Sequence, residues 1–125
     1  DVGSFFKEQA FIERTTFPGD EGIEIKVAEG NTSRLSITQL TPVDHDGRIE
    51  VFSITLFGGK TLQTHFFQYK GEESGYLISG ELTMTSMDQT HTLVPGDTVY
   101  LKTASPTKWE NRGKTDAVLL WMKIK

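Results

Sequence analysis

Two stretches decide which fold to expect: GKTLQTHFFQYKGEESGYLISG at residues 59–80 and PGDTVYLKTASPTKWENRG at residues 95–113. In the first, His65 lies after the opening glycine with five residues between, and Glu73 lies before the closing glycine with six residues between. Both stretches place Gly, Pro, Asp or Asn at their ends, and these residue types favour chain reversals. Short β-strands joined by tight turns are therefore predicted here.

Alternation of apolar and polar residues continues outside these stretches, as expected for strands that bury one face. The clearest alternating segments are 23–27, 35–38, 52–56, 82–85 and 98–102. Residues 117–124 are apolar at almost every position, which predicts a central strand covered on both sides. Only residues 5–14 suggest a short helix, and an extended arm suits them equally well. Many short strands with frequent turns predict an all-β jelly roll or barrel.

Composition narrows the classes of function. Lys and Arg total 13 against 17 Asp and Glu, so the formal net charge is −4. An acidic domain binds nucleic acid poorly by itself, because neutralising phosphates requires a basic surface. The absence of Cys excludes disulfides, thiolate nucleophiles and Cys-ligated zinc, and it suits a cytoplasmic protein. No apolar run is long enough to cross a bilayer, so no membrane association is expected.

The two quoted stretches resemble the two sequence motifs of the cupin family. The matching features are Glu73 before its glycine, the Pro-Gly-Asp turn at 95–97, Pro106, and Asn-Arg-Gly at 111–113. This resemblance implies a double-stranded β-helix, which is a small jelly-roll barrel. It also implies a homodimer, because cupins of this kind commonly pair through an edge strand or an N-terminal arm.

A further resemblance points to regulators of transcription. GEESGY at residues 71–76 is similar to cupin sensor domains that follow the helix-turn-helix of XRE-type regulators, and VGSFFKE at 2–8 is similar to the linker between them. The resemblance implies an arm or linker at 1–14, a cupin barrel at 15–125, and a DNA-binding domain upstream of Asp1.

The metal-binding positions of the family are largely replaced in this chain. Metal-dependent cupins coordinate an ion with two His and one Glu of the first motif and one His of the second. Here His65 and Glu73 remain, whereas Phe67 and Thr107 stand where the other two His would be. Because two protein ligands rarely hold a transition metal, we expect no tightly bound metal cofactor.

The resemblance therefore predicts a domain that binds a small-molecule effector, dimerises, and reaches DNA only through the upstream helix-turn-helix. Thr107 and Trp109 are two residues apart, so both should face the cavity, with Trp109 providing an apolar wall. The effector would enter at the mouth of the barrel. The predicted ligand contacts are His65, Gln68, Glu73, Tyr76, Thr107 and Trp109.

Other interpretations stay open at this point. A metal-dependent cupin dioxygenase, isomerase or lyase would need a compensating ligand such as Gln68 or Tyr69. A metal-free sugar-modifying cupin would use His65 as a general base. Structural roles are also possible, in which His65 bonds a neighbouring side chain, Glu73 is a solvated loop charge and Trp109 fills the barrel.

Overall fold

The computed structural model describes residues 13–68 and 71–125, and within them the chain is almost entirely β-structure. One short 3₁₀ turn, η1 (Gly19–Glu21), precedes the strands. This confirms the all-β prediction, whereas the arm or helix predicted at 5–14 lies almost wholly outside the described residues. The strands are β1 (Ile23–Ile25), β2 (Leu35–Gln39), β3 (Ile49–Leu56), β4 (Thr61–Leu62), β5 (Glu73–Ser79), β6 (Leu82–Ser86), β7 (Gln89–Leu93), β8 (Thr98–Leu101), β9 (Lys108–Glu110) and β10 (Ala117–Ile124).

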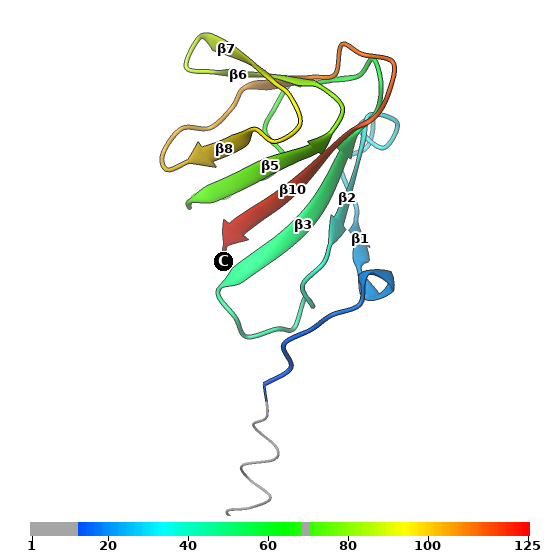
Figure 1. The fold of residues 1–125 in the computed structure, drawn as a ribbon, viewed down its shortest axis with the longest axis vertical. Coiled ribbons are helices and arrows are strands. Elements are labelled where there is room, and N and C mark those ends of the chain that lie inside the picture. Colours follow the sequence, from blue (N-terminus) through cyan, green and yellow to red (C-terminus); the bar gives the residue numbers. More distant parts are fainter. Residues whose placement is uncertain (1–12, 69–70) are drawn as a thin grey trace, which may run out of the picture.

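The strands form two antiparallel sheets (Figure 1). The larger has the order β1-β2-β3-β10-β5-β8 and the smaller β4-β9-β6-β7. Strand β10 pairs with β3 on one side and β5 on the other, which confirms the predicted central strand. Its outward side chains Val118, Leu120 and Met122 are only half-buried, so that face is less covered than predicted. In the part of the chain that is described, no helix is long and apolar enough to cross a bilayer.

The core lies between the two sheets and follows the period-two pattern of the sequence. On β3 the inward residues Phe52, Ile54 and Leu56 are buried, while the residues between them are half-buried. The smaller sheet contributes Leu62, Leu82, Met84 and Leu93 from the opposite side. Burial of one face of each sheet against the other is the main stabilising term of such a fold.

The turns of the second motif are held by side-chain hydrogen bonds. In the Pro-Gly-Asp turn, the Asp97 carboxylate accepts a bond from the amide of Val94 at 2.9 Å. The buried Asn111 amide donates to the carbonyls of Leu56 and Thr115, each at 2.9 Å, and its oxygen accepts from the amide of Gly113 at 3.0 Å. Asn111 thereby joins the loop after β9 to the end of β3, which explains its place in the motif.

Gly75 of β5 leaves the space that Trp121 of β10 occupies. The two residues are directly opposite in the antiparallel register. A Cβ atom at position 75 would lie 2.3 Å from the Trp121 ring, well inside van der Waals contact. The indole thus covers the glycine, an arrangement seen when an aromatic side chain rescues a strand glycine.

We expect Gly75→Ala to lower the free energy of unfolding by about 1–3 kcal/mol, because the added methyl group displaces the buried Trp121 ring. Gly19→Ala is the matched control: no atom lies within 4 Å of its added Cβ, and the change should cost less than about 0.5 kcal/mol. Urea unfolding of both variants measures the difference. Equal stability of the two variants would show that the β5–β10 contact tolerates a side chain.

Candidate functional site

A buried histidine–glutamate pair lies between the two sheets. His65 belongs to the segment that follows β4, and Glu73 is the first residue of β5. Both residues are only 6% exposed. The His65 Nε2 atom lies 3.1 Å from Oε1 and 3.0 Å from Oε2 of Glu73. The structure therefore excludes the interpretation of Glu73 as a solvated loop charge.

Two tryptophans close the other side of this pair. The Trp109 Nε1–H donates to Nδ1 of His65 at 3.2 Å, and the Trp121 Nε1–H donates to Oε1 of Glu73 at 3.0 Å. Because an indole N–H is only a donor, His65 Nδ1 must accept and carries no proton. The proton is then on Nε2, which donates to the Glu73 carboxylate. His65 is thus a neutral imidazole with both nitrogens engaged.

Aromatic rings fill the centre of the barrel around this network. Trp109 and Trp121 are fully buried, with ring centroids 5.8 Å apart in an edge-to-face arrangement. Phe66 stacks on Trp109 at 4.6 Å. The structural role considered for Trp109, filling the barrel, is confirmed. These rings therefore occupy the space between the two sheets beside His65 and Glu73.

The donor set does not fit a metal ion. Phe67, at the position of the second family histidine, packs on Phe52 with ring centroids 4.7 Å apart. Thr107, at the position of the last histidine, is exposed. The one lone pair of the neutral His65 ring, on Nδ1, accepts the hydrogen bond from Trp109, and Nε2 carries the proton that it donates to Glu73. Within 13–68 and 71–125, no three His, Cys, Asp or Glu side chains gather as a metal site would need.

The structure brings only some of the predicted contact residues together. His65, Glu73 and Trp109 form one network, and Gln68 lies at the surface beside it. The prediction that Thr107 shares the inner side with Trp109 is wrong, because β9 begins only at Lys108 and the Thr107 hydroxyl turns to the Thr85 carbonyl. Tyr76, predicted as a ligand contact, lies on the outward face of β5 and is 44% exposed.

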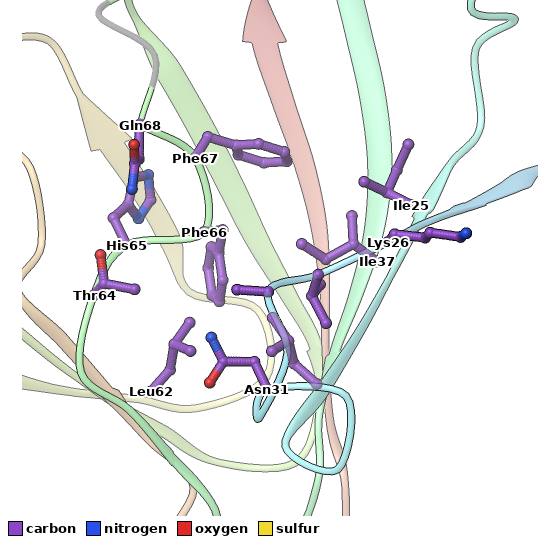
Figure 2. A pocket seen from close by; sticks show the side chains of 13 residues that line it. Ile25, Lys26, Asn31, Ile37, Leu62, Thr64, His65, Phe66, Phe67 and Gln68 are labelled. Carbon is purple, nitrogen blue, oxygen red and sulfur yellow. The ribbon is translucent and has the colours of Figure 1, made fainter.

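Open space remains where the larger sheet meets the segment after β4. A hollow of about 260 Å³, which we call the mouth pocket, lies between these parts (Figure 2). A second hollow, of about 450 Å³, shares Phe67 and Gln68 with it and adds Glu73 and Lys102. The mouth pocket is lined chiefly by Ile25, Ile37, Leu62, His65, Phe66, Phe67 and Gln68.

Several residues of this site were not predicted. Trp121 completes the network. Its position in the alternation of the central strand, where it points inward opposite Gly75, is the feature that could have identified it. Phe66, which is not among the predicted ligand contacts, both stacks on Trp109 and lines the mouth pocket. Ile25 and Ile37 reach the pocket from the first two strands of the larger sheet, which the two motifs do not include.

The comparison with known families agrees with this geometry. A family model described as Cupin domain (Cupin_2) matches residues 57–123, which is more than half of the chain. This chain belongs to the cupin family. The match includes both motif stretches and ends within β10, so it spans the buried network. No curated protein sequence matches this cupin.

Solved structures share the fold of this cupin. The Cupin_2 domain of an XRE-family transcriptional regulator from Enterobacter cloacae is 23% identical over 72% of this chain and 95% of that chain, with a TM-score of 0.62. A cupin-superfamily sugar phosphate isomerase from Silicibacter pomeroyi is 16% identical over 89% and 76%, with a TM-score of 0.71. An HTH_3-family transcriptional regulator from Vibrio cholerae is 20% identical over 74% and 51%, with a TM-score of 0.60. Regulators and an enzyme thus share this fold.

Proposed function

We propose that this cupin is the effector-binding and dimerisation domain of a bacterial transcriptional regulator, and that it works without a metal cofactor. The observation that carries the proposal is the closed network of His65 and Glu73 with Trp109 and Trp121, next to an open apolar pocket. A site that acts on a substrate through His65 needs a free lone pair, which this network does not leave. A pocket lined by apolar side chains suits recognition of a small molecule.

The position of the mouth pocket supports a regulatory role. Ile25 and Ile37 lie on β1 and β2 at one edge of the larger sheet, whereas Leu62 lies on β4 at the edge of the smaller sheet. An effector held between them contacts both sheets at once. It therefore stabilises one relative arrangement of the sheets, and a population shift of this kind is how a ligand alters a distant surface.

The outer face of the larger sheet supports the proposed homodimer. Ile78 and Tyr100 are 50% and 62% exposed on it, and exposed apolar patches on sheets commonly mark interaction surfaces. Glu72 at its border accepts a hydrogen bond from the Tyr100 hydroxyl at 2.6 Å, which raises the pKa of Tyr100 and keeps the phenol neutral. A neutral apolar face suits a second copy of itself. The apolar and aromatic side chains of this outer face on β3, β5, β8 and β10 are Ile49, Val51, Tyr76, Ile78, Tyr100, Val118, Leu120, Met122 and Ile124.

We expect Ile78→Glu to weaken dimerisation at least about tenfold, because a carboxylate buried without a partner is costly. The residue is half-exposed in the monomer, so the fold should tolerate the change. Met87→Glu is the matched control, since Met87 is also exposed but lies in the β6–β7 turn, away from the outer face. Sedimentation equilibrium measures the dimer dissociation constant of both variants and of the parent chain. A monomeric parent chain, or equal dimerisation of the two variants, would overturn the proposed interface.

The coding sequence that precedes the codon for Asp1 tests the assignment to a regulator. We expect an in-frame helix-turn-helix domain there, because the acidic cupin itself is a poor partner for phosphates. A gene product without a DNA-binding domain would contradict the regulatory role. Binding of a small molecule at the mouth pocket would not be affected by that result.

An enzymatic role has less support from the site. Of the compensating ligands considered for a metal-dependent cupin, Gln68 lies at the surface and Tyr69 lies outside the described residues. A role of His65 as general base requires an unprotonated nitrogen that faces a substrate. Its unprotonated nitrogen, Nδ1, instead faces Trp109.

A further inference from the structure

The described residues that form the walls of the mouth pocket carry no charge that faces a ligand. Of the lining residues that the structure describes, Lys26 alone has a permanent charge, and its side chain extends away from the hollow in Figure 2. His65 is the only other ionisable residue there, and both of its nitrogens are engaged. A charged molecule that entered would lose its hydration without gaining an ion pair, which is unfavourable.

The shape and lining of the pocket suit a small ring or a short branched chain. Phe66 and Phe67 provide aromatic surface on one side, and Ile25 and Ile37 face them from the larger sheet (Figure 2). The volume of about 260 Å³ is just below the usual lower limit for drug-sized ligands, roughly 300 Å³. Apolar contact with these side chains would therefore supply most of the binding energy.

Neutral polar groups stand at the border of the pocket. Thr64 and Gln68 are exposed on the side of His65, and Asn31 approaches from the loop between β1 and β2. A hydroxyl and two amides donate and accept hydrogen bonds without carrying charge. They suit a ligand with one hydroxyl, carbonyl or amide group, and they give no advantage to a carboxylate or an ammonium group.

We infer that the mouth pocket binds small uncharged molecules that combine an apolar ring or chain with one neutral hydrogen-bonding group. This inference rests on the proposed effector-binding function and specifies the chemical class of the effector. The apolar body lies against Phe66, Phe67 and Ile37, and the polar group lies near Gln68. The charge of the ligand, rather than its size alone, is the property that the pocket rejects.

Three probes with the same ring test the inference: benzyl alcohol, benzoate and benzylamine. Each is titrated into the whole 125-residue chain, and binding is followed by the methyl NMR resonances of Ile37 and Leu62. We expect benzyl alcohol to bind at least about tenfold more tightly than either charged probe, because only the charged probes lose hydration without compensation.

A pair of variants on β1 controls the experiment. Ile25→Lys places an ammonium group at the pocket wall and should make benzoate the preferred probe, whereas Ile23→Lys, on the same strand but not lining the pocket, should leave the order unchanged. If a charged probe binds the parent chain as tightly as benzyl alcohol, the inferred ligand class is wrong while the pocket remains an effector site. If no probe shifts the Ile37 and Leu62 resonances, the effector site itself is wrong.

Discussion

Replacing Glu73 by alanine is expected to lower the free energy of unfolding by about 2–6 kcal/mol, because two buried donors lose their acceptor. Glu73 accepts hydrogen bonds from His65 Nε2 and from Trp121 Nε1 in a region almost closed to water. Its loss leaves two buried donors without acceptors, and each unsatisfied group costs about 1–3 kcal/mol.

Glu72→Ala provides the matched control for this prediction. The residue precedes Glu73 in the chain, but its carboxylate makes an exposed hydrogen bond to Tyr100. Exposed interactions of this kind contribute about 1 kcal/mol or less. Urea unfolding of the two variants compares the same chemical change at a buried and at an exposed position. A Glu73→Ala variant as stable as Glu72→Ala would contradict the closed network.

Truncation of Trp109 should have an effect of similar size. Trp109 is fully buried, stacks on Phe66 and donates to His65. Trp109→Ala is expected to cost about 3–5 kcal/mol, because the centre of the barrel loses its largest ring and a cavity remains. Thermal or urea unfolding measures this loss directly.

Trp109→Phe separates the two contributions of the indole. Phenylalanine keeps an aromatic ring against Phe66 but has no N–H group, so His65 Nδ1 loses its donor. We expect this variant to be less stable than the parent by about 1–3 kcal/mol and more stable than Trp109→Ala. If Trp109→Phe matches the parent chain in stability, the hydrogen bond to Nδ1 contributes nothing and the lone-pair argument against a metal weakens.

The fold was predictable because its signals are local. Alternation with a period of two places each inward side chain without knowledge of its partner strand, as on β3 and β10. The spacing of His65 and Glu73 around a turn also limits how far apart they can lie. The family resemblance placed the two side chains in one barrel, and the structure shows them in contact.

The remainder of the site depends on contacts between distant segments. Trp121 reaches Glu73 because β5 and β10 are neighbours in the larger sheet, a pairing that separates the residues by 48 positions in sequence. The alternation of inward and outward side chains also holds only within a strand. Thr107 was assigned to the face of Trp109, but β9 begins at Lys108 and the Thr107 side chain turns outward.

The location of the mouth pocket was the least predictable feature. The family resemblance predicted a cavity faced by Thr107 and Trp109, but Trp109 is fully buried against Trp121 and Thr107 is exposed. The hollow lies instead on the outer side of His65, where Ile25 and Ile37 meet the segment after β4. Side-chain packing in three dimensions decides which volume is filled and which stays open, and periodicity carries no information about it.

The most direct test of the account is the protonation pattern of His65, measured by long-range ¹H–¹⁵N NMR correlations and assigned by comparison with His65→Gln. We predict a neutral ring protonated at Nε2, with Nδ1 as an acceptor, and resonances that do not change when equimolar Zn²⁺ or Mn²⁺ is added. A ring protonated at Nδ1, or His65 signals that shift or broaden on addition of either metal, would show that the imidazole is available as a ligand and would contradict the central claim.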